Sequence, residues 1–468
     1  MALTPIPSLI VVALIDSIPL EPPERGLRRN HGYWVRAQLT TMLYTHTVID
    51  QVCYYVPRLR VPMCARAAVA VSSATLTILT TYGLALAIGF PVPFTLTLLG
   101  LPWATFFTVS LWLVCRKFLH ENPAVLREVL RYSPVFLCQL SMVSLYPAFL
   151  SAFSSLGPSG QTALVLVLPL IKLTEKNLMS RVLSDRDDIK PELVIFSVEV
   201  FSALFASLCM QSSSSNATNF VIMGIDFLQA CISMYDVNAH LKEINVLAAK
   251  MGVPRGEEIR VAIAMLAAQG STADSDASLA AGPKINKIAP LAAQGLLAAG
   301  PKVSANQIAS LEEIRSATML PEDQLELCEK LRRVLFLTEF VLLVEFTEIM
   351  IPVVYAAYVC VLFYLPNRVY YPRLGSMDTD DLHRTVGSVL SYAGMELVSF
   401  VVLCVVLQRK LRASAMHQLA FVLERQWAMV QSKMVLWIVF MLQSTLVHLG
   451  ADYTFQFKWL RSPPPPQT

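Results

Sequence analysis

Charged side chains are scarce in this chain. Only 15% of its 468 residues are Asp, Glu, Lys or Arg, whereas soluble domains carry about 25%. The chain is 55% hydrophobic, with a mean hydropathy of +0.54. This composition excludes an ordinary water-soluble protein and indicates that a lipid bilayer sets the architecture. A net charge of +3 is also too small to indicate a nucleic-acid partner.

The sequence lacks the short motifs that carry catalytic chemistry. It contains no HExxH, GxSxG or GxGxxG motif and no P-loop. The acidic run DTDD at 378–381 lies in a short loop and is typical of a solvated turn. The nine cysteines are isolated and form no CxxC pair, which argues against a disulfide or zinc framework. We therefore predict a protein that is not an enzyme, with no cofactor and no metal site.

Long apolar segments are what the chain has in abundance. A membrane-spanning helix needs roughly 20 mainly apolar residues. Eight segments qualify: 67–89, 92–114, 134–156, 192–211, 217–235, 336–364, 386–407 and 433–449. Two weaker candidates, 36–56 and 162–182, contain polar or charged residues. The predicted fold is all-α, a polytopic integral membrane bundle of eight to ten transmembrane helices.

Basic residues occur in alternate loops, which predicts the orientation of the chain. They gather around 116–131, 181–190, 242–333 and 409–425, while 89–93, 156–161 and 211–216 contain no Lys or Arg. The positive-inside rule places the basic loops in the cytoplasm. The segment 36–56 has basic residues on both sides, so its orientation stays open. The choice between the plasma membrane and an endomembrane also stays open.

Composition divides the chain into four parts. Residues 1–235 form an amino-terminal membrane block of six or seven helices, and 334–449 form a carboxy-terminal block of about three. Residues 236–333 form a cytoplasmic linker between them. Its low-complexity part, 258–302, repeats LAAQG and LAAGPK and has little to bury, so we expect a largely disordered loop. The tail 450–468 is expected on the non-cytoplasmic side.

The sequence also predicts a role for two smaller segments. Residues 308–333 contain two amphipathic helix patterns split by Pro321, which makes them a possible docking site for a cytoplasmic protein. The short apolar run from Ser8 to Ile15 has no basic residue ahead of it. It fits a truncated or interfacial hydrophobic segment better than a signal peptide.

Carboxylates within the apolar segments are the candidate functional residues. Glu199, Asp226 and Glu396 lie near the centres of predicted spans, and Glu345 and Glu348 are three residues apart on one helical face. An unpaired charge at mid-bilayer costs about 2.5–3.5 kcal/mol, so such groups are rarely accidental.

The cationic residue at comparable depth is Lys172, for which Glu175 is the expected local partner. The carboxylates therefore outnumber their cationic partners. This excess fits a proton or cation pathway formed by the five acids and Lys172. It also fits structural hydrogen bonds, in which each acid is capped by a neighbouring Ser or Gln. A shared water-sized cavity would favour the first interpretation.

Interrupted helices are a feature of many transporter binding sites. Pro169 interrupts the segment 162–182, Pro352 follows Glu348 by four residues, and Gly224 precedes Asp226 by two. Breaks at these positions would support the transport interpretation, although Gly and Pro are also common in ordinary membrane helices.

Three stretches carry a family resemblance: LVLVLPLIKLTEKNLMSR, PELVIFSVEVFSALFASLCMQSSSS and HLGADYTFQFKWL. Together they resemble a large family of multi-pass membrane proteins of oomycetes of the Phytophthora type. The resemblance covers most of the chain outside the low-complexity loop. It implies an integral membrane protein and transfers no functional residue, because it rests on no catalytic motif.

Two functions follow as hypotheses. The first is a transporter or channel-like protein that uses its intramembrane carboxylates to conduct a proton or a cation. The alternative is a non-catalytic membrane scaffold or receptor-like protein that acts through its cytoplasmic loop. The lipid bilayer is the partner that both hypotheses require.

Overall fold

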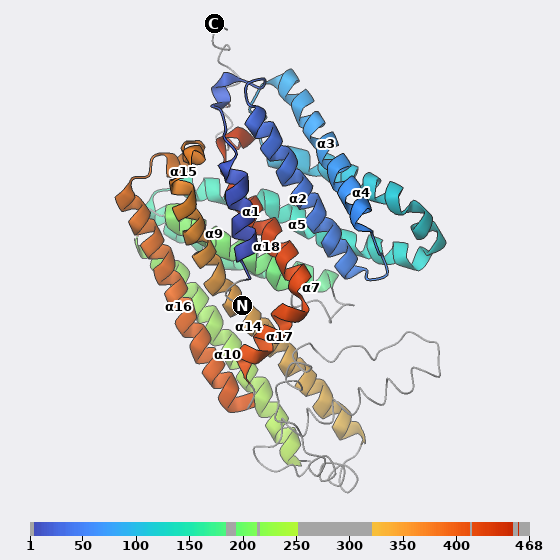
Figure 1. Ribbon diagram of the computed structural model, residues 1–468. Helices are drawn as coiled ribbons and strands as arrows, with labels where there is room; N and C mark the ends of the chain where they lie inside the picture. The colour runs from blue at the N-terminus through green and yellow to red at the C-terminus, as the bar shows by residue number, and fades with distance from the viewer. Residues whose placement is uncertain are drawn as a thin grey trace.

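The computed structural model describes residues 4–183, 193–212, 216–250, 321–411, 414–452 and 457. Within these ranges the chain is mainly α-helical, with short 3-10 segments and turns between the helices and no β-strand. The helices pack side by side as a bundle (Figure 1). The expected all-α membrane fold is confirmed.

Five helices are long and apolar enough to cross a membrane. They are α3 (Met63–Ile88), α4 (Thr95–Glu121), α5 (Pro123–Ser155), α10 (Asn216–Lys250) and α16 (Thr379–Leu411). Each overlaps a predicted span. On α3 and α4 less than a third of the apolar segment is buried inside the protein. Helices that are hydrophobic all round yet exposed require a lipid environment.

Three shorter apolar helices form the centre of the bundle. They are α1 (Ile6–Ser17), α9 (Val200–Ser212) and α18 (Trp427–Gln443). The side chains of Phe201, Phe205 and Trp437 on α9 and α18 are almost completely buried. The short amino-terminal apolar run is therefore a core element, because α1 packs against α18 and against the long helix α14 (Pro321–Phe363).

The remaining elements connect and cover these helices. α2 (His31–Tyr55) packs on α3 and α18, and the short α17 (Ala415–Arg425) leads into α18. Four 3-10 or short helical segments complete the fold: η1 (Pro23–Arg25), η3 (Pro366–Tyr370), α15 (Pro372–Gly375) and η4 (Val447–Leu449).

Gly450 follows η4 with φ +61°, and its carbonyl accepts a hydrogen bond from the Phe94 amide. A Cβ at Gly450 would lie 2.3 Å from the Val92 carbonyl oxygen, so only glycine fits there.

The predicted linker 236–333 is helical at both ends. α10 continues to Lys250 and α14 begins at Pro321, where the two helices pack together. Their ends at residues 250 and 321 lie at the opposite end of the bundle from α15 (Figure 1). The low-complexity stretch 258–302, the first half of 308–333 and most of the tail 450–468 lie outside the described residues.

The three positions at which Pro or Gly could interrupt a helix have different outcomes. The segment 162–182 is divided into α6 (Pro158–Val165) and α7 (Leu168–Val182), as expected from Pro169. At Pro352 and Gly224 the helices are unbroken, because α14 and α10 continue through these residues. α14 packs against α9, α10 and α16, and neighbouring helices allow a membrane helix to continue through a proline. An interruption that we did not predict is a π-helical turn, η2 (Ile195–Glu199), directly before α9.

Candidate functional site

A buried lysine joins two of the predicted carboxylates. Lys172 Nζ lies 2.7 Å from Glu199 Oε2 and 2.8 Å from Glu348 Oε1. Lys176, one turn later on α7, forms an ion pair with the other oxygen of Glu199. Glu199 is fully buried, and the side chains of Lys172 and Glu348 are less than 10% exposed. These contacts connect α7, η2 and α14 through charged groups.

The other three predicted acids lie next to this ion-paired core. The Asp226 carboxylate, on α10, accepts a hydrogen bond of 2.7 Å from the Tyr392 hydroxyl on α16. Asp226 also interacts electrostatically with Lys172, and Glu396 interacts with Glu345 and Glu348. We call the whole set the carboxylate–lysine cluster: Lys172, Lys176, Glu199, Asp226, Glu345, Glu348, Tyr392 and Glu396.

The structure therefore brings all six predicted site residues together and adds Lys176 and Tyr392. Sequence reasoning missed Lys176 because it lies near the end of the weak segment 162–182. The signal was present, since Lys172 and Lys176 are four residues apart and share one face of α7. Tyr392 gave no signal, because a tyrosine in an apolar helix is common.

Backbone irregularities position the two central charges. Glu199 is the last residue of the π-helical turn η2, and Lys172 lies in the first turns of α7, directly after the break from α6. A π-helical turn inserts an extra residue and reorients the side chains around it, and such turns are frequent at functional sites. Both partners of the ion pair thus come from segments that depart from a regular α-helix.

The partners of the acids differ from those expected. Glu175 does not pair with Lys172; it accepts a 2.9 Å hydrogen bond from the Tyr146 hydroxyl instead. Glu199 and Glu348 pair with lysines, and only Glu345, among the acids of the cluster, has a serine partner in the described residues, Ser399 on α16. The acids are thus gathered in one place, and capping by Ser or Gln does not account for them.

Charge is not balanced within the carboxylate–lysine cluster. Five carboxyl groups face two lysines, so three carboxyl groups have no cation of the cluster to neutralise them. Burying an uncompensated carboxylate is costly, and a proton is the smallest group that removes its charge. The arrangement can therefore hold protons on the carboxyl groups that no lysine neutralises.

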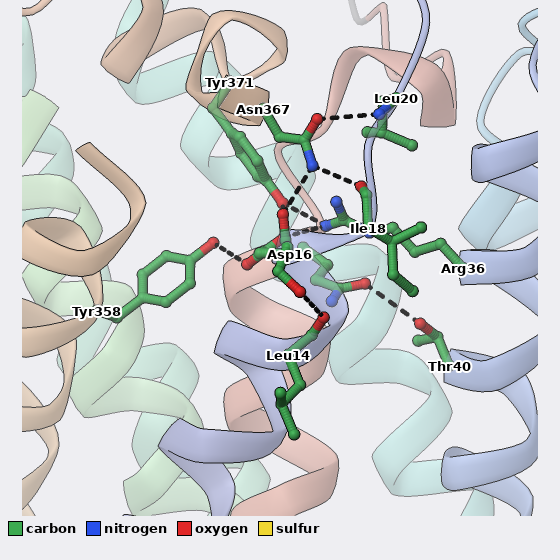
Figure 2. A network of polar contacts seen from close by, with 11 residues as sticks. Leu14, Asp16, Ile18, Leu20, Arg36, Thr40, Tyr358, Asn367 and Tyr371 are labelled. Carbon is green, nitrogen blue, oxygen red and sulfur yellow. Dashed lines mark hydrogen bonds and ion pairs between the residues drawn. The ribbon is translucent and has the colours of Figure 1, made fainter. Parts of the chain in front are cut away.

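A second polar network, which sequence reasoning missed, joins α1 and α2 to α14 and to the segment that follows α14 (Figure 2). Asp16 on α1 forms a buried ion pair with Arg36 on α2. Its carboxylate also accepts hydrogen bonds from the hydroxyls of Tyr358, at 2.9 Å, and Tyr371, at 2.7 Å. The Asn367 amide donates to the Asp16 carbonyl oxygen at 2.7 Å. The signal in the sequence was one acid directly after the apolar run Ser8–Ile15 and one base at the start of the segment 36–56.

No family model, curated protein or solved structure matches the chain. The resemblance to the oomycete family therefore stays a prediction. Among the described residues, no three His, Cys, Asp or Glu side chains are placed to hold a metal ion. The function is consequently inferred from the geometry of the carboxylate–lysine cluster.

Proposed function

We propose that the protein is a proton-coupled membrane transporter whose carboxylate–lysine cluster carries the proton. The observation that supports this function is the meeting of five carboxyl groups and two lysines at a buried junction. Lys172, Glu199 and Asp226 come from the amino-terminal membrane block, whereas Glu348 and Glu396 come from the carboxy-terminal block. A change of charge in the cluster would therefore act on the interface between the two blocks.

The transported charge is a proton rather than a larger cation. The Lys172 ammonium group already occupies the position between Glu199 and Glu348 that a metal cation would need. Proton uptake requires no additional space, and it removes the cost of burying a carboxylate without a counter-ion. Ionisable groups inside the membrane mark proton relays in other pumps and transporters.

Exchange of partners at Lys172 provides a mechanism. With both Glu199 and Glu348 ionised, Lys172 holds η2 and α14 together. Protonation of Glu348 weakens one of these contacts, and Lys172 then pairs with Glu199 alone. The break before α7 and the π-helical turn at Glu199 let the two segments adjust without disrupting regular helices. The helices can then adopt two arrangements that hold different numbers of protons. A transporter that opens to each side of the membrane in turn requires two such arrangements.

A scaffold or receptor-like role is the competing function, and one observation favours it. α10 has 35 residues, which gives about 52 Å of helix, although about 30 Å suffices to cross the apolar part of a membrane. With α14 it lines a polar hollow that includes Lys242, Glu243 and Lys330. The positive-inside rule puts this end in the cytoplasm, where a protein partner could dock.

Infrared spectroscopy tests the proton site without knowledge of the transported substrate. We expect purified protein at neutral pH to show absorption from protonated carboxyl groups. The variants Glu348→Gln and Glu396→Gln should each reduce this band, since the amide cannot bind the proton. Glu121→Gln, which changes an exposed acid at the end of α4, is the matched control and should leave the band unchanged.

Proteoliposomes then test transport. A pH-sensitive dye inside the vesicles should report faster acidification under a potassium-driven membrane potential for the wild-type protein than for Glu348→Gln. If the folded wild-type protein shows neither the protonated band nor proton flux above empty vesicles, the proton-transport proposal is wrong and the scaffold role is favoured. If the protonated-carboxyl band is present but no proton flux is measured, the cluster binds protons and moves them across the membrane only together with the transported substrate.

A further inference from the structure

A cavity of about 170 Å³ lies between α2, α3, α4, α5 and α18. It shares no residue with the carboxylate–lysine cluster, so it is a separate site. Most of its wall is apolar and includes Leu96, Leu99, Trp103, Phe136 and Phe440. A cavity of about 150 Å³ is large enough to hold benzene. The volume of this cavity would therefore accommodate a small molecule with a ring or a short chain as its body.

Several polar groups of the cavity wall lack hydrogen-bond partners. Within the described part of the chain, no acceptor is found for Nε and Nη1 of Arg36, Nε1 of Trp437 or Nε2 of Gln443. All of these atoms are donors. The carbonyl oxygen of the Gln443 side chain, by contrast, is paired with the Thr40 hydroxyl at 3.4 Å. Buried donors without acceptors are uncommon in native proteins and call for a specific explanation.

The electrical charge of the wall is already balanced. Arg36 is the charged residue among the lining side chains, and its guanidinium group is paired with Asp16 (Figure 2). An anion bound here would therefore be buried without a free counter-ion, which is strongly unfavourable. A neutral molecule with an acceptor oxygen would instead satisfy a donor at no cost in buried charge.

We propose that this cavity binds a small, neutral, apolar molecule that carries a carbonyl-type oxygen, such as an aryl ketone or ester. The apolar wall surrounds its body, and the unpaired N–H groups of Arg36, Trp437 or Gln443 donate to its oxygen after small rotations of these side chains. A few polar groups in an otherwise apolar pocket are the usual design of small-molecule sites. The proposal is independent of proton transport.

A matched set of probes tests the proposal: acetophenone, ethylbenzene and benzoate, which are similar in size. Purified full-length protein in detergent is titrated with each probe, and intrinsic tryptophan fluorescence and the melting temperature are recorded. We expect acetophenone to bind about fivefold more tightly than ethylbenzene, the ratio that one neutral hydrogen bond provides. Benzoate should bind more weakly than acetophenone.

Two variants and a control locate the site. Gln443→Met removes one of the three candidate donors and should reduce the preference for acetophenone over ethylbenzene, while the protein still binds both. Leu99→Phe fills the cavity and should weaken the binding of both probes, whereas Leu79→Phe on the exposed face of α3 should leave the binding of both unchanged. The thermal melt confirms that each variant is folded.

Two results would overturn the proposal. Equal binding of acetophenone and ethylbenzene to the wild-type protein would mean that the unpaired donors do not recognise an acceptor. Unchanged binding to folded Leu99→Phe would mean that the probes bind elsewhere, including in the detergent micelle.

Discussion

Replacing Asp16 with alanine removes the anion from the buried network that attaches α1 to the rest of the bundle. The Asp16 side chain is 0% exposed and Arg36 is 2% exposed, so neither group can exchange its partner for water. The hydroxyls of Tyr358 and Tyr371 would lose their acceptor at the same time. The substitution therefore leaves one buried cation and two buried donors unsatisfied.

The expected loss of stability is large. Removing one partner of a buried ion pair costs about 3–5 kcal/mol, and each donor left without an acceptor costs about 1–3 kcal/mol. These costs are not additive, because all of the groups share one carboxylate. We expect Asp16→Ala to lower the free energy of unfolding by about 5 kcal/mol, which is a third or more of the roughly 5–15 kcal/mol of a typical protein.

Thermal and denaturant unfolding of the purified protein in detergent measure this loss. Glu24→Ala, an exposed acid on η1, is the matched control and should melt like the wild type. The double variant Asp16→Ala/Arg36→Met should be more stable than Asp16→Ala alone, because it no longer buries an unpaired guanidinium group. If Asp16→Ala melts like Glu24→Ala, or if the double variant is no better than the single one, the network does not stabilise the fold as described.

Two further predictions concern the stability effect of buried side chains outside the carboxylate–lysine cluster. Burial lowers the pKa of His448, on the short η4 segment beyond the end of α18, from its usual value of 6.5 to about 4. The unfolded chain therefore binds a proton at His448 more readily than the folded protein does. The contribution of His448 to the free energy of unfolding is fully present above about pH 6.5, and up to about 3 kcal/mol of it is lost as the pH decreases to about 4. The melting temperature of His448→Gln should depend less on pH over this interval than that of the wild type. Lys433 on α18 is fully buried, and among the described residues no hydrogen-bond partner for its amine is found. Lys433→Met should therefore raise stability by about 1–3 kcal/mol, and a lower melting temperature would show that the amine has a stabilising contact.

The candidate acids could be chosen from the sequence because the cost of burying a charge depends mainly on local hydropathy. Glu199 and Glu396 stand out in any apolar window, wherever the helices pack. Their partners could not be chosen in this way. Lys172 and Glu348 are 176 residues apart, and Glu175, which is closer to Lys172 in the chain, pairs with Tyr146.

The helix breaks show the same limit. Proline identified the break before α7 but not the continuity of α14, since packing against neighbouring helices decides whether a helix continues through a proline. The π-helical turn at Glu199 contains no Gly or Pro and had no signature in the sequence. It is a property of how η2 fits against α14 and α18.

By itself, the sequence determined the class of this protein, its helical architecture and the acids worth testing, because apolar length and burial cost are read one segment at a time. The tertiary structure alone decided which charges meet, that α1 belongs to the core, and where a cavity with unpaired donors remains. Those features depend on contacts between segments separated by hundreds of residues, such as Asp16 and Tyr371. Local hydropathy carries no information about them, because many arrangements of the same helices would satisfy it equally well.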